Sequence, residues 1–451
     1  MIIWKIAPCF LFYICAAAAR RDLISTQKGT DMNITGIIAE YNPFHNGHAY
    51  HLAQAKKETH ADYLIVILSG NFVQRGAPAL LDKFVRAKMA LLEGADLVIE
   101  LPPLWSCASA EYFAGAGIAL LRQLGCVNAL SYGCETPSAE VFDVMLDLLS
   151  QEPPLYQQQL ASAQKRGLSY AAARENALLS LLPDTMQDAA RSVLRNPNNI
   201  LALEYQKAIA KQAAPIKVRP ILRLGAGYHC TRLSGPLASA SAIRSLIASQ
   251  CEDSNFQKIP KALRQAMPPS AFALMTEYHS RYPFLYENDC SQMLHYALLK
   301  NAADGFSMYA DCSLQLSRKI CGSLEQFDGY SSFCTQLKSK DIAYTRISRV
   351  LSHILLDIQK SDYELWRSRS YVPYAKVLGF RRESRGLLAH LKKHSFLPLL
   401  TRTADVKKLL SDEERLFYEK QSFADTLYRA IVFEKGRQKM PHETRQQIVI
   451  V

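Results

Sequence analysis

The stretch that decides the fold is Gly36-Ile37-Ile38-Ala39-Glu40-Tyr41-Asn42-Pro43-Phe44-His45-Asn46-Gly47-His48. A short apolar run with strand character leads into a turn rich in Asn and Pro, and a helix-like segment, Ala49 to Ala61, follows. The first backbone N–H groups of a helix lack internal partners and the helix dipole favours negative charge there, so this arrangement makes an anion site. His45 and His48 add side-chain donors, and Gly47 lets another group approach the backbone closely. The pattern predicts binding of a nucleoside triphosphate whose α-phosphate is attacked.

The length and composition are those of a globular protein with more than one domain. The 451 residues are too many for one compact core, so two or three domains are expected. Hydrophobic residues make up 49% and charged residues 21%, which is typical of a globular, soluble protein. The net charge of +12 and pI of about 9.1 suit a polyanionic partner such as nucleic acid or a membrane surface, although the solvated surface of any basic protein has the same composition.

The cysteines predict a reduced, cytoplasmic protein. There are eleven, an odd number, and no C-x-x-C pair occurs. Cys107, Cys126 and Cys321 lie in apolar or core-like segments, as buried reduced thiols do. No spacing typical of a zinc or iron–sulfur site is present, so no metal ligands are assigned.

The first 31 residues are set apart from the fold. Lys5 precedes an apolar run, Ile6 to Ala19, which ends in four alanines and is followed by Arg20-Arg21. This resembles a signal peptide with a small-residue cleavage site. The alternative, which we favour, is a misassigned start with Met32 as the true first residue. No other stretch is long and apolar enough to span a membrane.

Strands and helices are predicted to alternate from Gly36 to about Gln151. Apolar runs predict the strands 34–39, 63–68, 96–100 and 127–132, and periodic apolar positions predict the helices 47–60, 82–93, 109–124 and 138–150. Repeated β–α units imply an α/β fold with a parallel, Rossmann-like sheet and helices on both faces. Ligands bind beyond the carboxyl ends of such strands, and the turn with His45 and His48 lies at one of these ends.

The rest of the chain is predicted to be mostly helical. Residues 151–195 have the pattern of a polar helical insertion in a nucleotide-binding domain that spans residues 32–245. Residues 246–451 are predicted to form a helical, basic region. Its last part, residues 341–451, has 21 Lys and Arg against 13 Asp and Glu. This segment therefore carries +8 of the chain's net +12, which suits contact with a nucleic acid.

Recognisable motifs occur in order along the chain. His45-Asn46-Gly47-His48 resembles the H-x-G-H signature of nucleotidyltransferases and class I aminoacyl-tRNA synthetases. Longer strings resemble those of the bacterial tRNA(Met) cytidine acetate ligases: EYNPFHNGH (40–48), SGNFVQRG (69–76), DLVIELP (96–102), PNNIL (197–201), ASASAIR (238–244) and YTRISR (344–349). The resemblance runs from Met32 to the C-terminus.

This resemblance implies a fold, an activity and partners. The fold implied is a HUP-type nucleotidyltransferase domain followed by a mostly helical domain. The activity implied is activation of acetate by ATP as acetyl-adenylate, then acetylation of N4 of the wobble cytidine in elongator tRNA(Met). Mg²⁺ is expected with the triphosphate, but no carboxylate cluster identifies its ligands. We expect no membrane contact, and no obligate protein partner is evident.

We assign His45, His48 and Arg75 to catalysis. The histidines can stabilise charge on the triphosphate as pyrophosphate departs, and helix capping or core packing is their alternative. Arg75 offers a fixed fork for phosphate or carboxylate, and a solvated turn arginine is its alternative. The ATP-binding residues implied by the resemblance are Ile38, Ala39, Glu40, Tyr41, Asn42, Pro43, Phe44, His45, Asn46, Gly47, His48, Ala49, Tyr50, His51, Gly133, Asn198, Arg223, Ser239, Ser241 and Arg244.

Several of the ATP assignments have plain structural alternatives. A glycine at a strand end, such as Gly133, is more often part of a turn, and Asn198 can be an ordinary loop residue. Ser239 and Ser241 open a predicted helix and would cap it whether or not a phosphate binds. Arg223 lies in a strand entering the turn at Gly225, and an arginine over a triphosphate is physically reasonable.

Arg346, Arg349 and Arg382 are assigned to the tRNA backbone. The first two share one face of a predicted helix with His353, and the charge excess gathers in this region. A solvated basic face is the alternative for each residue.

Two other functions remain open at this point. An adenylyltransferase acting on a small phosphorylated metabolite would share the H-x-G-H core but would not need the long basic helical chain. A non-catalytic RNA-binding protein with a relict nucleotide pocket is the second, and the intact His45, His48 and Arg244 argue against it.

Overall fold

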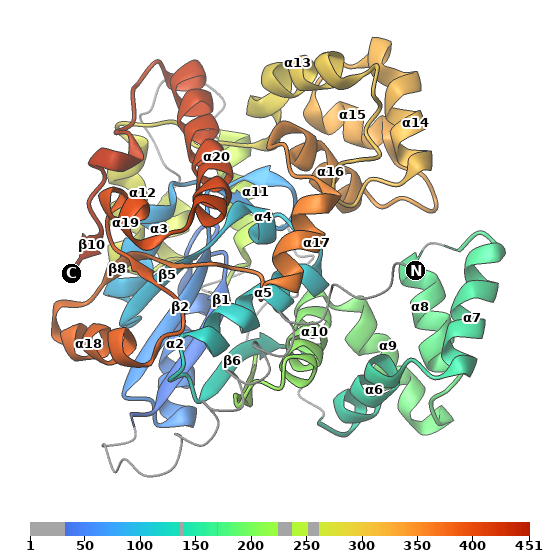
Figure 1. The fold of residues 1–451 in the computed structure, drawn as a ribbon, viewed down its shortest axis with the longest axis horizontal. Helices are drawn as coiled ribbons and strands as arrows, with labels where there is room; N and C mark the ends of the chain where they lie inside the picture. The colour runs from blue at the N-terminus through green and yellow to red at the C-terminus, as the bar shows by residue number, and fades with distance from the viewer. Residues whose placement is uncertain (1–31, 136–138, 169, 224–236, 251–260) are drawn as a thin grey trace, which may run out of the picture. The chain divides into compact units, whose positions relative to one another are not determined.

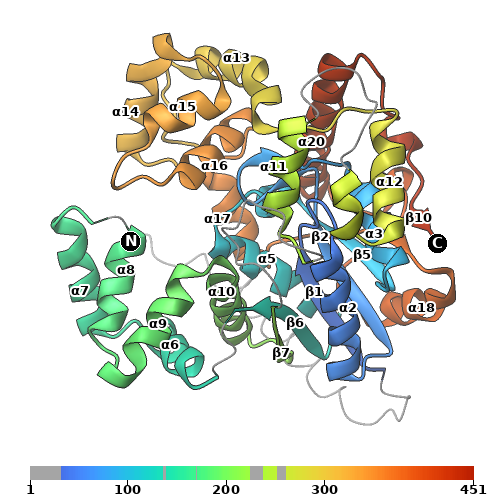
Figure 2. The same ribbon diagram turned by 180° about the vertical axis from the view of Figure 1, so that it is seen from behind.

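The structure is a computed structural model that describes residues 32–135, 139–168, 170–223, 237–250 and 261–451. The N-terminal extension, Ser138 and Gly225 lie outside these residues. Asn33–Val451 form one compact unit, in which helices cover both faces of a central sheet (Figures 1 and 2). Among the described residues, no helix is both long enough and apolar enough to cross a membrane.

Within the described ranges, the central sheet has eight strands. Its order is β10 (Val449–Ile450), β8 (Ala375–Phe380), β5 (Leu97–Leu101), β2 (Tyr63–Ser69), β1 (Ile34–Ala39), β6 (Ala129–Cys134) and β7 (Lys217–Leu222), with β9 (Leu399–Leu400) paired to β8. The run from β5 to β7 is parallel, so these strands end at one edge of the sheet, which we call the carboxyl edge. β8 is antiparallel to β5.

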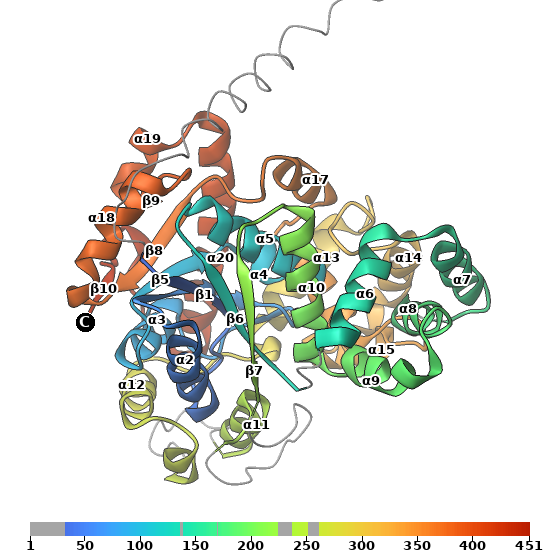
Figure 3. The same ribbon diagram turned by 90° about the horizontal axis from the view of Figure 1, so that it is seen from below.

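Glycine lets one helix lie very close to the central strand. α2 (Asn46–Thr59) and α3 (Lys83–Leu92) cover one face of the sheet, and α5 (Ala110–Gln123) and α10 (Pro197–Lys211) cover the other (Figure 3). A Cβ at Gly36 in β1 would lie 2.6 Å from Leu121, and one at Gly117 in α5 would lie 2.5 Å from Ile38. The absence of both side chains therefore sets the spacing between α5 and β1.

The other described helices follow one another along the chain. The short α4 (Pro103–Ser106) precedes α5. The segment between β6 and α10 contains α6 (Ala139–Gln151), α7 (Pro154–Lys165), α8 (Tyr170–Leu179) and α9 (Asp184–Arg195). After β7 come α11 (Ala240–Gln250), α12 (Pro269–His279), α13 (Ser291–Asn301), α14 (Leu314–Ser323), α15 (Tyr330–Leu337), α16 (Tyr344–Leu355) and α17 (Lys360–Ser368). The last group is α18 (Arg385–His394), α19 (Val406–Leu409) and α20 (Asp412–Gly436).

The predicted α/β fold with a parallel nucleotide-binding sheet is confirmed. The predicted strands and helices as far as α6 match observed ones, with ends that differ by a few residues. Sequence analysis missed the three strands β8, β9 and β10, which residues 246–451 add to the sheet. The domain boundary near residue 245 stays a prediction, and a cut there would separate these strands from the sheet that they complete.

A buried charge cluster fixes the C-terminal part of the chain to this sheet. Lys83 Nζ in α3 lies 2.8 Å from Glu100 Oε1, 2.5 Å from Asp425 Oδ2 and 3.0 Å from Glu443 Oε1. Lys376 in β8 lies 3.0 Å from Glu100 Oε2 and also contacts Glu443. Because a buried charge that loses its partner is strongly destabilising, this cluster holds α3, β5, β8 and α20 together.

A second contact ties the segment after β2 to α16. This segment forms a small hairpin of β3 (Phe72–Val73) and β4 (Ala77–Pro78), and Gly76 at its turn has φ +74°. A Cβ there would lie 2.4 Å from Arg349 N and from the carbonyl carbon of Ser348. Tyr330 Oη and Ser348 Oγ both donate to the Gly76 carbonyl, each at 2.8 Å.

We predict that Gly76→Ala lowers the melting temperature far more than Gly167→Ala. Both glycines have a left-handed φ, +74° and +82°, but a Cβ at Gly167 meets nothing within 4 Å. Left-handed strain costs each variant about 1–2 kcal/mol, and only Gly76→Ala adds an overpacking cost of about 1–3 kcal/mol. Thermal denaturation of the two variants measures the difference, and equal shifts would contradict the close packing of α16 on Gly76.

Candidate active site

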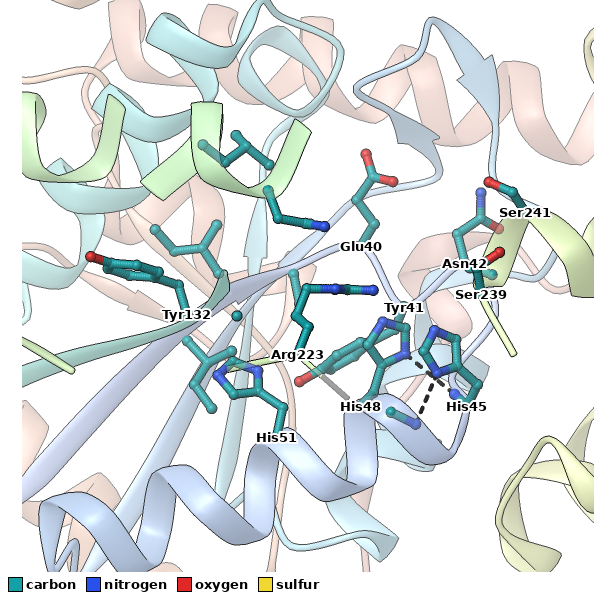
Figure 4. Close-up of a pocket in the computed structure, with 18 of the residues that line it drawn as sticks. Glu40, Tyr41, Asn42, His45, His48, His51, Tyr132, Arg223, Ser239 and Ser241 are labelled. Carbon is teal, nitrogen blue, oxygen red and sulfur yellow. Dashed lines mark hydrogen bonds between the residues drawn. The ribbon is translucent and has the colours of Figure 1, made fainter. Parts of the chain in front are cut away.

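A cavity of about 200 Å³ lies at the carboxyl edge of the sheet. Its walls come mainly from the ends of β1, β6 and β7, from α2, α10 and α11, and from the segment of Gln74 and Arg75. Figure 4 shows side chains from these elements converging on it, with the histidines of α2 on one side and Ser239 and Ser241 beyond them. The predicted position of the site, beyond the ends of parallel strands, is where the cavity lies.

His45 and His48 cap the helix through one ring nitrogen each. His45 Nδ1 accepts the Gly47 backbone N–H at 3.0 Å, and His48 Nδ1 accepts the His45 backbone N–H at 3.3 Å. The rings stack with centroids 3.7 Å apart. Since Nδ1 is an acceptor in both rings, the proton of each neutral ring is assigned to Nε2. The capping alternative therefore holds, and it leaves each ring an Nε2–H donor for a ligand.

The surroundings keep the pocket histidines neutral. Burial, with the nearby Arg223 and Arg244, lowers the pKa of His45 to about 3. Burial, the adjoining His45 and Arg223 hold the pKa of His48 well below its ordinary value. Burial and Arg223 lower the pKa of His51 to about 4, and its Nε2 lies 3.0 Å from Ser131 Oγ. At neutral pH the positive charge of the pocket therefore comes from arginine.

Arg244 joins α11 to the turn after β1. Its Nη1 donates to the Asn42 carbonyl at 2.5 Å, and its Nη2 donates to Ser241 Oγ at 3.3 Å. Ser239 Oγ accepts the Ala242 backbone N–H at 3.1 Å, as the capping alternative predicts. Ser239, Ser241 and Arg244 all line the cavity, so capping leaves them beside the ligand space.

The opposite wall is built from β6, β7 and α10. Asn198 lies in the first turn of α10 rather than in a loop, and its Nδ2 donates to Glu135 Oε1 at 2.5 Å. The same oxygen lies 3.8 Å from Arg223 Nε. A Cβ at Gly133 would lie 3.1 Å from Arg223 Cγ, so this glycine gives the arginine room to lie across the end of β6.

A buried arginine that the sequence analysis missed holds the loops of this edge. Arg86 in α3 is fully buried and donates only to backbone carbonyls in the hydrogen bonds seen among the described residues. Nη1 bonds the Glu40 carbonyl at 2.7 Å and the Ser69 carbonyl at 3.0 Å, Nη2 bonds that of Gly70 at 2.5 Å, and Nε bonds that of Leu81 at 2.9 Å. The sequence carried no clear signal for this role, because α3 also contains Lys83 and Lys88.

Most of the residues assigned to ATP or catalysis line the cavity, including Arg75. Four do not: Phe44 packs in the hydrophobic core, Asn46 Nδ2 donates to the Gln265 carbonyl at 2.8 Å, Ala49 packs against that core, and Pro43 is not part of the lining. Other residues line the cavity without having been assigned to it: Ile37, Gln74, Phe113, Tyr132, Leu201, Tyr205, Ile221, Leu222, Leu237, Ala238 and Ala240. Of these, Gln74, Leu201, Ala238 and Ala240 lie within the motifs that carry the resemblance, and the motif was the signal for them.

The three arginines assigned to tRNA lie in two places. Arg346 and Arg349 lie on α16, where both contact Asp311: Arg346 Nη2 donates to its carbonyl at 3.1 Å, and Arg349 Nε to its Oδ2 at 3.0 Å. His353, on the same helix, is buried between the carbonyls of Ala310 and Cys107. Arg382 is exposed and follows β8 at the sheet edge opposite the cavity.

The buried charge cluster is not a metal site. Glu100, Asp425 and Glu443 place three carboxylate oxygens close enough to share a cation. The ammonium group of Lys83 already lies among them at 2.5–3.0 Å. The ammonium group of Lys83 occupies the position that a metal ion would need. We therefore assign the cluster a structural role.

The chain is similar to known proteins over nearly all of its described length. The HIGH Nucleotidyl Transferase family model matches residues 32–444. A protein of Clostridium kluyveri named tRNA(Met) cytidine acetate ligase is 37% identical over 377 residues, which cover 82% of this chain and 90% of that protein. A protein of the same name from Acetivibrio thermocellus is 32% identical over 422 residues, covering 93% of this chain and 100% of its own.

Solved structures give the same result. The apo crystal structure of Thermotoga maritima TmcAL matches with a TM-score of 0.85 and 28% identity, covering 93% of this chain and 100% of that one. A crystal structure of the same protein bound with alpha-thio ATP matches with a TM-score of 0.82 and 27% identity over the same shares.

We predict that stability falls as the pH drops from about 6.5 towards 4, in part because of His51. Its pKa in the folded protein, about 4, lies below the ordinary value of 6.5, so in this range the unfolded chain binds a proton that the folded protein does not. The free energy of unfolding therefore has its full value, as far as His51 is concerned, above pH 6.5 and decreases as the pH falls towards 4. Melting temperatures of His51→Asn should therefore fall less steeply than those of the wild type.

The matched control for this prediction is His442→Asn, which changes an exposed histidine outside the cavity. It should keep the wild-type dependence of melting temperature on pH. The neutral state of His51 would be contradicted if His51→Asn showed the same pH dependence as the wild type.

Proposed function

This chain belongs to the tRNA(Met) cytidine acetate ligase family of HIGH nucleotidyltransferases, and on that premise we propose that it is an ATP-dependent tRNA cytidine acetate ligase. In the first step an acetate oxygen attacks the α-phosphorus of ATP, and pyrophosphate leaves. In the second step N4 of the wobble cytidine of elongator tRNA(Met) attacks the acetyl carbonyl, and AMP leaves. We expect the enzyme to work in the cytoplasm, where its tRNA substrate is found.

The observation that carries this proposal is the pairing of two neutral histidine donors with two arginines around one cavity. The Nε2–H groups of His45 and His48 are fixed by the hydrogen bonds that their Nδ1 atoms accept. Arg223 and Arg244 line the same cavity and add positive charge to it. Donors that are fixed before the reaction stabilise charge developing on the triphosphate without reorganisation. Alignment of the acetate oxygen with the α-phosphorus contributes the remaining rate acceleration.

Arg75 is proposed to act with these groups as a fork for acetate or phosphate, since it lines the same cavity. Gly133, Asn198, Ser239 and Ser241 are proposed as ATP contacts for the same reason. The relative bound with alpha-thio ATP shows that this family's fold accepts such a nucleotide.

Mg²⁺ is proposed to enter with the ATP. Protein sites for this ion usually combine one or two carboxylates with phosphate oxygens and water. Glu40 is the one carboxylate among the described residues that line the cavity, and its Oε1 accepts the Gln74 backbone N–H at 2.8 Å. The ion would therefore be bound mainly through phosphate oxygens and water.

The tRNA is proposed to approach along α16. The close packing of Gly76 places this helix directly behind the segment of Gln74 and Arg75, which line the cavity. Arg346 and Arg349 each use only part of their guanidinium group on Asp311, which leaves further N–H donors for phosphate. Arg382 would meet a different part of the tRNA, because it lies at the opposite edge of the sheet.

One assay separates the proposal from its alternatives. Exchange of labelled pyrophosphate into ATP is measured with and without acetate, then with a panel of phosphorylated metabolites. A ligase of this kind should exchange only with acetate. Exchange with a phosphorylated metabolite instead would indicate an adenylyltransferase, and no exchange under any condition would indicate a non-catalytic protein.

We predict that His45→Asn and His48→Asn lower the rate of acetate-dependent exchange by about a hundredfold, the usual loss for one donor to developing charge. Asparagine at the N-cap keeps an acceptor for the backbone, so His45→Asn removes the Nε2–H donor while preserving the cap. Melting temperature should change little. The control is His60→Asn at the other end of α2, where φ is +49° and asparagine is well tolerated. Near-wild-type exchange in both pocket variants would contradict the assignment.

We predict that Arg346→Ala, Arg349→Ala and Arg382→Ala weaken tRNA binding and leave exchange without tRNA unchanged. Each lost phosphate contact should reduce the slope of log affinity against log salt by about 0.9. Arg191→Ala, which changes an exposed arginine of α9, is the matched control. An unchanged salt slope, or an equal loss of exchange, would place the substituted arginine elsewhere than on the RNA.

A further inference from the structure

Glu40 is held by its backbone carbonyl and by one carboxylate oxygen, while the other carboxylate oxygen is open. Its backbone carbonyl accepts Arg86 Nη1 at 2.7 Å, and its Oε1 accepts the Gln74 N–H at 2.8 Å. No hydrogen bond from the described part of the chain reaches Oε2. Figure 4 shows the carboxylate turned away from the rings of His45 and His48. A negatively charged carboxylate is unfavourable in a pocket that is proposed to bind anions, so its fixed position there suggests a chemical role.

We propose that Glu40 binds the N4 amine of the target cytidine and accepts its proton during acetyl transfer, an inference that rests on the proposed function. The exocyclic N4–H₂ of cytosine is a hydrogen-bond donor that carboxylates recognise. As the bond between N4 and the acetyl carbon forms, the bond between that carbon and the AMP oxygen breaks, and AMP leaves with the electron pair. One N4 proton passes to Glu40 Oε2 and then to water. Every atom and charge is accounted for without another reactant.

The other polar groups around the cavity are less able to take this proton. The Nδ1 atoms of His45 and His48 already accept backbone N–H groups, so their remaining ring nitrogens are donors. His51 Nε2 pairs with Ser131 Oγ, on the β6 side of the cavity. Arginine stays protonated in proteins. Among the described residues that line the cavity, Glu40 alone offers a carboxylate.

The position of Glu40 also matches the direction from which RNA is proposed to come. The hydrogen bond from Gln74 joins Glu40 to the segment that ends at Gly76. Gly76 packs against Ser348 and Arg349 in α16, the helix proposed to contact the tRNA. Glu40 therefore lies between the nucleotide side of the cavity, marked by the histidines, and the side backed by α16.

The test separates the two chemical steps in the full chain. Glu40→Gln keeps an oxygen for the Gln74 N–H but cannot take up a proton at neutral pH. Because Glu40 also lines the ATP cavity, acetate-dependent exchange by this variant is the reference for the second step, and we expect exchange to fall far less than transfer does. Single-turnover transfer from preformed acetyl-adenylate to tRNA should fall by about 10²–10⁴-fold, the usual contribution of a general base.

Two further variants make the outcome decisive. Glu40→Asp keeps a carboxylate, so its transfer rate should fall less than that of Glu40→Gln. A purely structural role for Glu40 would not require this difference between the two variants. Glu58→Gln, at an exposed position of α2, should behave as the wild type in both steps.

Three results would overturn the inference. The first is unchanged transfer in Glu40→Gln. The second is an equal loss of exchange and transfer, and the third is a raised Mg²⁺ requirement. Either of the last two would assign Glu40 to ATP or its metal ion. Failure of the proposed function itself would look different, because the wild-type protein would then show no acetate-dependent exchange.

Discussion

The arrangement of the carboxyl edge depends on the hydrogen bonds of one buried guanidinium group. Arg86 bonds the carbonyls of Glu40, Ser69, Gly70 and Leu81, which belong to three different segments. Burying a carbonyl without a donor, or a guanidinium group without acceptors, costs free energy. All of these groups are hydrogen-bonded only when the three segments are in place. The turn with the histidines begins directly after Glu40, so its position follows from this contact.

The segment from Ser69 to Gly76 connects that edge to the C-terminal half of the chain. Asn71 Nδ2 donates to Asp425 in the buried charge cluster at 3.0 Å, and the Gln74 N–H donates to Glu40. Gly76 packs on α16. The cavity, the cluster and the helix proposed to bind RNA thus share one short segment, which gives a physical reason why the ligase needs its C-terminal chain even where that chain does not touch the nucleotide.

The parts that the sequence predicted and the parts that it missed differ in how local their causes are. The long apolar runs of β1, β2 and β5 are strands by pattern alone, and the turn after β1 is marked by its own residues. β9 and β10 are two residues long, and β8 includes Lys376 and Gly379, so only their partners make them strands. Arg86 was missed for a similar reason, because its role depends largely on the carbonyls of Glu40, Ser69 and Gly70 at the ends of two other strands, and tertiary context sets such roles.

The histidines show why two interpretations of one motif need not compete. A ring has two nitrogens, and in His45 and His48 the helix cap uses the acceptor while the donor stays available. Capping also fixes the tautomer, and burial beside Arg223 keeps the rings neutral. A neutral donor stabilises developing charge without holding the finished product by full ionic attraction, whereas the arginines are proposed to bind the triphosphate throughout the reaction. The division of labour between transition-state donors and ground-state charges therefore follows from the same hydrogen bonds that begin the helix.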